Sequence, residues 1–146
     1  MKELVEVFFS VIQDENGWPP LSCERIWCLP SDDDVFVVDN IPFYARDISF
    51  GDEVQTEESD GVRWFASLVK PSGNTTLRVF ALNKAVGPLL IPKLRALGGL
   101  TEKMEGSDFI AVSLPPSADI AQVLDFLDRE SNNGNLAFEE SSVRYL

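Results

Sequence analysis

The sequence predicts an α+β protein with a β-rich first half packed on a ferredoxin-like second half. Before residue 74, short apolar runs alternate with acidic and Gly/Pro turns, and helical periodicity appears only after that point. The turn-forming cluster Pro71-Ser72-Gly73-Asn74 separates the two patterns. We therefore expect a β-rich acidic subdomain over residues 1–74 and an α+β subdomain over residues 75–146.

The first half is expected to form a small barrel or a strongly bent sheet of five short strands. Runs rich in Val and Phe place these strands at residues 3–12, 24–29, 34–38, 53–56 and 62–70. Asp60-Gly61, between the last two strands, is a strong signal for a tight hairpin turn. Trp64 and Phe65 must face opposite sides of a shared strand, so one of them approaches solvent.

The second half has the strand and helix order of a ferredoxin-like sandwich, βαββαβ. Its strands are expected at residues 76–82, 100–105, 109–114 and 136–141. Helical spacing predicts a helix within residues 89–97, which becomes regular at Pro92 and ends at Gly98. Ser117 is expected to cap a second helix over residues 118–129, whose apolar face consists of Ile120, Val123, Leu124 and Leu127.

The charge of the chain is strongly negative and unevenly distributed. The sequence has 24 acidic and 12 basic residues, and residues 1–70 contain 15 of the acids and 5 of the bases. This field disfavours direct binding to nucleic acid, because it repels phosphates. It favours association with a basic protein, although acidity that only keeps the protein soluble explains the composition equally well.

The residue types give no sign of catalytic or metal-binding chemistry. The chain contains no histidine, which is the commonest general base and the commonest metal ligand. Cys23 and Cys28 have no second pair for a zinc site, and we expect one buried and one partly exposed reduced thiol. The acidic run at residues 31–34 lacks the ligand spacing of a calcium loop. We therefore expect a protein without enzymatic activity, metal or cofactor.

The expected location is the cytoplasm. The apolar runs are too short to span a membrane, so no contact with membranes is expected. Acidic residues interrupt the first apolar residues, which excludes a signal peptide pattern.

Three segments of the sequence carry a resemblance to a known family. They are Asp39-Asn40-Ile41-Pro42-Phe43-Tyr44-Ala45, Gly51-Asp52-Glu53-Val54 and Ser72-Gly73-Asn74-Thr75-Thr76-Leu77-Arg78. Together they resemble a bacterial family of domains of unknown function with D-N-I-P-F-x-A, G-D-x-V and S-G-x-x-T-x-R motifs, over roughly residues 22–140. The family implies no activity and no catalytic residues. Its similarity to small accessory proteins found near bacterial toxin genes implies an immunity role.

The motif residues have two interpretations. Most of them fit structural roles: Pro42 fixes the backbone, and Phe43 can then enter the core. In the other interpretation, a polar cluster grips a small ligand, with the participation of Asp39, Asn40, Asp52 and Arg78.

The leading functional hypothesis is an immunity protein that neutralises a cognate bacterial toxin by masking its active site. This role requires no catalytic residues, and it explains the negative charge if the toxin is basic. The residues expected to bind the partner lie in two acidic loops and at two aromatic positions: Asp32, Asp33, Asp34, Tyr44, Glu57, Glu58, Asp60 and Trp64. The alternative is a small-ligand sensor or regulatory domain whose pocket is lined by Asn40, Asp52 and Arg78. The residues specify neither the partner's identity nor the oligomeric state.

Overall fold

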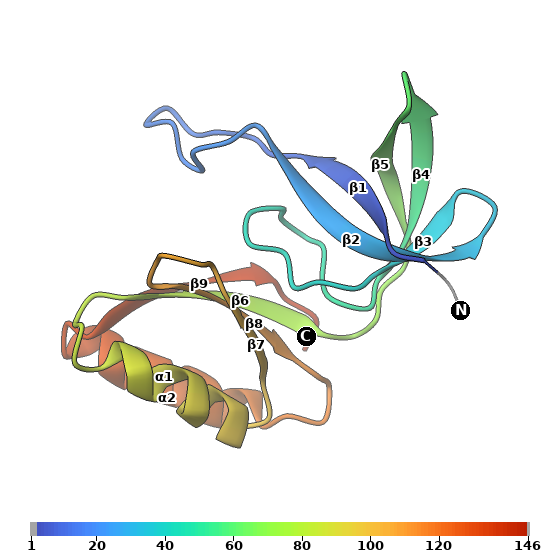
Figure 1. Ribbon diagram of the computed structural model, residues 1–146. Coiled ribbons are helices and arrows are strands. Elements are labelled where there is room, and N and C mark those ends of the chain that lie inside the picture. Colours follow the sequence, from blue (N-terminus) through green and yellow to red (C-terminus); the bar gives the residue numbers. More distant parts are fainter. Residues whose placement is uncertain (1–2, 146) are drawn as a thin grey trace. The chain divides into compact units, whose positions relative to one another are not determined.

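The computed structural model describes residues 3–145 and shows a strand-rich α+β protein with two helices (Figure 1). The chain divides into two compact units, residues 1–72 (unit 1) and residues 73–146 (unit 2). Each unit contains a hydrophobic cluster of its own. Within residues 3–145, neither helix has the length and apolar character needed to cross a bilayer.

Unit 1 is a closed barrel of five strands. The strands pair in chain order, each antiparallel to the next: β1 (Val5–Ser10), β2 (Cys23–Asp32), β3 (Val35–Val38), β4 (Glu53–Ser59) and β5 (Val62–Lys70). Because an odd number of alternating strands leaves the first and last pointing the same way, β1 meets β5 as a parallel pair, at Phe8 and Trp64. A barrel was one of the two forms that the sequence predicted for this half.

Side-chain alternation along the strands determines the core of unit 1. The inward positions of β1 to β4 are buried and contribute Val7, Phe9, Ile26, Cys28, Phe36, Val38 and Val54. Phe65 stacks on Phe9, with 4.9 Å between the ring centroids, whereas Trp64 packs against Phe8 at 5.4 Å. Trp64 and Phe65 therefore face opposite sides of β5, as expected.

Unit 2 is a four-stranded sheet with both helices on one face (Figure 1). Its elements follow in the order β6 (Thr75–Ala81), α1 (Gly87–Ala96), β7 (Leu100–Lys103), β8 (Phe109–Leu114), α2 (Ile120–Asn132) and β9 (Leu136–Ser142). Across the sheet the order is β7-β8-β6-β9, and every neighbouring pair is antiparallel. Sheet residues such as Leu77 and Val112 pack with Leu94 of α1 and Leu127 of α2 in the core.

Both helices begin at residues other than those predicted. Helix α1 starts at Gly87 with Pro88 in its first turn, and Pro92 lies inside it. The missing N–H of Pro92 deprives only the carbonyl of Pro88, at the exposed start of the helix, where water can replace the bond. Helix α2 is capped by Asp119 instead of Ser117, and the Asp119 carboxylate accepts a backbone N–H of the first turn at 3.1 Å.

Candidate functional site

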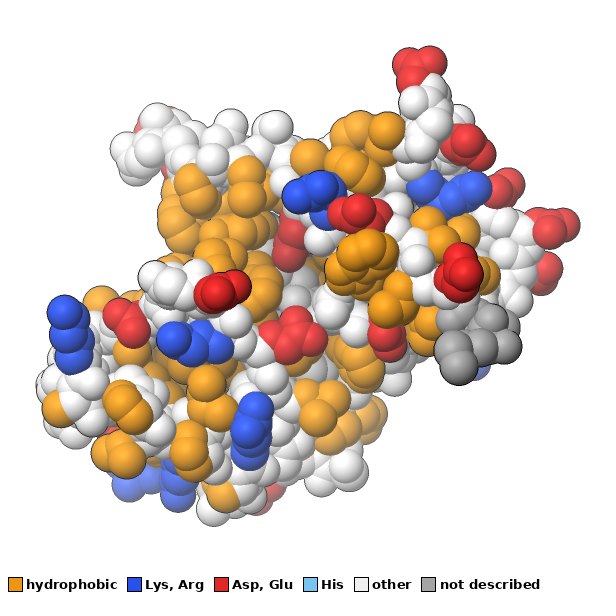
Figure 2. Space-filling model, viewed as in Figure 1, with side chains coloured by type: hydrophobic (Ala, Val, Ile, Leu, Met, Phe, Trp, Pro, Cys, Tyr) orange, Lys and Arg blue, Asp and Glu red, His pale blue; other side chains and the backbone are white. Residues whose placement is uncertain are grey.

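The two acidic turns of unit 1 are neighbours in the barrel. The β2–β3 turn is tied to β4 because the N–H and the hydroxyl of Thr56 both donate to the carbonyl of Asp34, each at 2.8 Å. Glu57 and Glu58, which were expected in a loop, lie instead on β4, because this strand continues past Thr56 to Ser59 before the turn at Asp60-Gly61. The end of β4 and the turn that follows it therefore extend from the β2–β3 turn. We call the combined set the acidic surface: Asp32, Asp33, Asp34, Glu57, Glu58 and Asp60. Figure 2 shows acidic side chains gathered over this part of unit 1.

Within residues 3–145, the cation that links the β2–β3 turn to the end of β4 is Arg63. Its guanidinium contacts Asp34 (Nη1–Oδ1, 2.9 Å) and Glu58 (Nη2–Oε2, 3.6 Å), and Nη1 also donates to the hydroxyl of Thr56 at 2.9 Å. The same group lies over the ring of Phe36, 5.0 Å from its centroid. With only 20% of its side chain exposed, Arg63 organises the surface from beneath. The sequence reasoning missed it, although it is the base that directly follows the acidic hairpin turn.

The other four acids of the surface are free to meet a partner. Asp32, Asp33, Glu57 and Asp60 are all exposed, and Asp32 only accepts the backbone N–H of Asp33 at 2.8 Å. Asp60 and Gly61 have φ values of 52° and 78°, as a two-residue hairpin turn requires. Of the residues that the structure describes, six acids and Arg63 make up this surface, which is therefore strongly negative and suits a cationic ligand.

The aromatic residues expected at the interface occupy different environments. Trp64 is half-buried on β5, opposite Glu57 in the β4–β5 register, and thus borders the acidic surface. Tyr44 is 8% exposed, and its ring meets Trp18 edge-on at 5.9 Å, so it presents little side chain to a partner. Trp27 was not predicted as a binding residue but is 44% exposed. Its two neighbours in β2, Ile26 and Cys28, point into the barrel. The alternation of side chains along a strand could therefore have predicted that Trp27 is exposed.

The D-N-I-P-F-x-A segment is held in place by Glu24. The carboxylate of Glu24 accepts three successive backbone N–H groups, from Phe43 (2.7 Å), Tyr44 (2.9 Å) and Ala45 (2.8 Å). Such converging N–H groups form a concave anion-binding arrangement, which here is filled by the protein's own side chain. Phe43, expected to enter the core, is half-buried. The segment is therefore an anchored loop, and its anchor lies outside the motif.

Asn40 and Asp52, two residues of the alternative ligand site, hold the backbone of unit 1. Oδ1 of Asn40 accepts the N–H of Trp27 at 3.0 Å. Asp52 is fully buried, and its two carboxylate oxygens accept the N–H groups of Ser49 at 2.9 Å and Ser72 at 2.8 Å. These contacts favour the structural interpretation of both residues.

Arg78, the third residue of the alternative ligand site, belongs to unit 2 and lies on β6. Its Nη1 is 3.0 Å from Oε1 of Glu139 on the neighbouring strand β9, and Arg78 is 3% exposed. Asp39, at the end of β3, donates its N–H to the carbonyl of Trp27 at 2.9 Å. These residues thus stabilise the two sheets in which they lie.

The two thiols differ in environment. Cys23 is half-buried and Cys28 is buried in the barrel, and both are free. Burial raises the pKa of the Cys28 thiol to about 12, so it stays protonated and unreactive at neutral pH. Within residues 3–145, no group of three His, Cys, Asp or Glu side chains could hold a metal ion.

Comparisons with known proteins place the chain among proteins of unknown function. A solved structure, described as a novel crystal structure of a hypothetical protein from Neisseria gonorrhoeae, shares its fold with a TM-score of 0.80 and 23% identity, covering 100% of this chain and 98% of that chain. No curated protein matches the chain. Residues 24–138 match the domain of unknown function DUF4265. Because this match covers most of the chain, the protein belongs to the DUF4265 family.

Proposed function

We propose that this protein is a non-catalytic binding protein whose acidic surface docks a basic protein partner. The observation that carries the proposal is the link that Arg63 makes between the acidic β2–β3 turn and the acidic end of β4, through its contacts with Asp34 and Glu58. Because these carboxylates are already held, less conformational entropy is lost when a partner binds. The exposed acids around them accelerate association with a cationic surface and repel acidic competitors.

The specific form that we propose is a cytoplasmic immunity protein, which masks the active site of a bacterial toxin domain. Enzymes that act on nucleic acid need cationic clefts to bind phosphates, and an acidic surface can occupy such a cleft in place of the substrate. The half-buried Trp64 beside Glu57 offers an aromatic contact of the kind that anchors protein interfaces. Neither nucleic acid nor membrane takes part in this role.

We also infer that unit 2 is a ferredoxin-like sandwich. The sheet order β7-β8-β6-β9 and the uniformly antiparallel pairs support this classification. Fold alone does not specify a function, so the binding role rests on the acidic surface of unit 1.

The first experiment is affinity capture of the tagged chain from a lysate of its own organism, at low and at high salt. We expect one basic protein in near-equal amount, and we expect its retention to fall as salt screens the charges. The purified partner is then assayed for its own activity with and without an equimolar amount of this protein. An eluate with no stoichiometric basic protein contradicts the proposal, and a partner that stays fully active in the complex contradicts the inhibitory form.

Two variants with the same change in charge test the location of the interface. The first carries Asp32→Lys, Asp33→Lys and Glu57→Lys, which avoids the two acids held by Arg63. The control carries Glu15→Lys, Glu105→Lys and Asp128→Lys, which are exposed acids outside the acidic surface. We expect the first variant to associate at least about tenfold more slowly with the partner and the control to change much less. Equal effects in the two variants would show that only net charge matters.

A further inference from the structure

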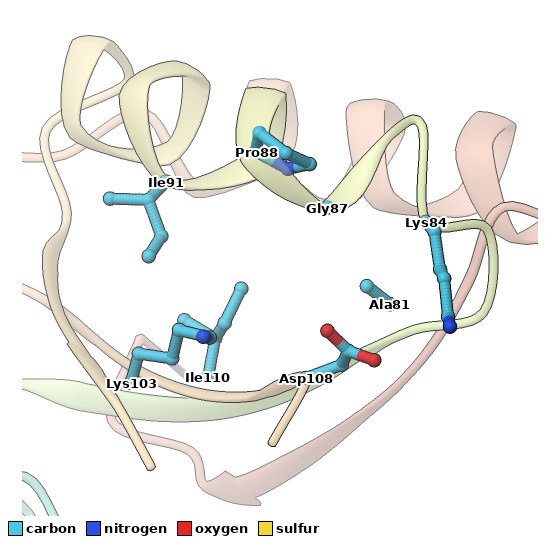
Figure 3. A pocket seen from close by; sticks show the side chains of 8 residues that line it. All are labelled: Ala81, Lys84, Gly87, Pro88, Ile91, Lys103, Asp108 and Ile110. Carbon is cyan, nitrogen blue, oxygen red and sulfur yellow. The ribbon is translucent and has the colours of Figure 1, made fainter. Parts of the chain in front are cut away.

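We infer that unit 2 binds a small organic monoanion with an apolar body, in a pocket between α1 and the end of the sheet (Figure 3). The pocket has a volume of about 370 Å³, which lies in the range of small-molecule sites. Its walls come from the end of β6, the start of α1 and the β7–β8 hairpin. This inference uses residues of unit 2 alone and does not depend on the acidic surface of unit 1.

One wall of the pocket is a turn that is anchored on both sides. The backbone carbonyl of Asn83 accepts the N–H groups of Val86 at 3.0 Å and Gly87 at 3.2 Å, which closes the turn into α1. The N–H of Asn83 in turn donates to the carbonyl of Asn135 at 3.2 Å, and the two side-chain amides meet at the same distance. Lys84 follows Asn83 directly, so its backbone is held at the rim of the pocket.

The opposite wall is the β7–β8 hairpin. Lys103 pairs with Ile110 in the β7–β8 register, and the carbonyl of Asp108 accepts the N–H of Ala81 at 3.1 Å. The side chain of Ile110, which is 2% exposed, lines the pocket from the sheet, and the half-buried Ile91 lines it from α1 (Figure 3). The pocket thus combines apolar side chains in its interior with charged groups at its rim, as small-molecule sites do.

The charges at the rim define the class of ligand. Lys84, Lys103 and Asp108 line the pocket and are exposed, and Figure 3 shows their charged ends around the same space. Within residues 3–145, the ion pairs and hydrogen bonds of the structure leave both ammonium groups without an acidic partner. Two cations and one anion make the rim locally positive in a protein of net charge −12.

A monoanion fits this rim better than a dianion or a cation. Two ammonium groups and one carboxylate give the rim a net charge of +1, which one negative charge on the ligand balances, whereas a second negative charge would be in excess and is repelled by Asp108, which disfavours phosphate. An aliphatic body can cover the half-buried side chain of Ile91 and the exposed ring of Pro88 and release water from them. A short branched-chain carboxylate therefore matches both parts of the pocket.

The first test is a titration of the full chain with 4-methylpentanoate, followed by NMR of backbone amides. The control ligand is 4-methylpentanamide, which has the same shape without the charge. We expect the carboxylate to shift amides around residues 84–91 and 103–110, and to bind at least about fivefold more tightly than the amide. Absence of shifts at millimolar concentrations, shifts located elsewhere, or equal affinity for the two ligands would overturn the inference.

Charge variants give a second, independent test. Lys84→Gln and Lys103→Gln should each weaken binding of 4-methylpentanoate about threefold to fivefold, and Asp108→Asn should strengthen it by a similar factor. Lys93→Gln removes the same charge from α1 at a side chain that lies over Phe126, outside the pocket lining, and should leave the affinity unchanged. A uniform response of all three lysine variants, or weaker binding by Asp108→Asn, would contradict the site.

Discussion

Glu24 is the residue whose replacement tests most directly how the D-N-I-P-F-x-A segment is held. Oε1 accepts the N–H groups of Tyr44 and Ala45, and Oε2 accepts that of Phe43. Glu24→Gln keeps the size of the side chain but converts one acceptor oxygen into a donor NH₂ group. If the amide oxygen takes the place of Oε1, the N–H of Phe43 faces another donor.

The expected loss follows from these three hydrogen bonds. A hydrogen bond to a charged group contributes about 1.5–3 kcal/mol, and glutamine loses one such bond and the charge in the other two. Because Glu24 is half-buried, water partly replaces what is lost. We therefore expect Glu24→Gln to lower the free energy of unfolding of unit 1 by about 2 kcal/mol and Glu24→Ala by about 3 kcal/mol.

Tryptophan fluorescence during urea unfolding is the appropriate assay. All three tryptophans, Trp18, Trp27 and Trp64, belong to unit 1, so the signal reports that unit alone. With a slope of about 1–1.5 kcal/mol per molar urea, a loss of about 2 kcal/mol lowers the midpoint by roughly 1.3–2 M. Glu15→Gln is the matched control, because Glu15 is exposed. Equal midpoints for the Glu24 and Glu15 variants would refute the anchoring role.

Three further predictions concern the thiols, the hairpin and the buried arginine. At pH 8 a thiol reagent should modify Cys23 and spare Cys28 until the chain is denatured, as counted by mass spectrometry. Because burial raises the pKa of Cys28 from its ordinary value of 9.0 to about 12, the free energy of unfolding should fall as pH rises above 9, by about 1 kcal/mol at pH 10 relative to Cys28→Ala. Gly61→Ala should cost unit 1 about 1 kcal/mol by tryptophan fluorescence, from backbone strain alone, because φ is +78° and nothing lies within 4 Å of the added carbon. Glu139→Gln should lower the stability of unit 2 by about 2 kcal/mol, measured by the helical circular dichroism that only unit 2 supplies, because it removes the carboxylate 3.0 Å from Arg78.

Local chemistry made most of the strands predictable. Turn formers bound the runs that became β5 (Val62–Lys70) and β8 (Phe109–Leu114), and both strands have the predicted bounds. Helix starts were less predictable, because α1 had a proline at residue 88 and another at residue 92, and either fits a first turn. The choice depended on how the chain leaves β6, which is a tertiary contact.

The roles of residues whose partners are distant in the sequence could not be predicted from the sequence. Glu24 lies 19 residues before the first N–H group that it accepts, and Arg63 lies 29 residues after Asp34. Both contacts depend on the register between strands, and local composition does not encode register. Tyr44 was expected to bind the partner but is buried, in the loop whose backbone Glu24 holds.

The pocket of unit 2 could not be predicted from the sequence either, because separate segments of the chain form it. Lys84, Lys103 and Asp108, taken singly, are ordinary surface charges, and Ile110 is an ordinary core residue. Only the pairing of β7 with β8 and the contact between Ala81 and Asp108 bring them around one space. The acids of the acidic surface could be picked out in the sequence because they form two short runs, at residues 32–34 and 57–60. The pocket instead combines charges of both signs that are scattered along the chain.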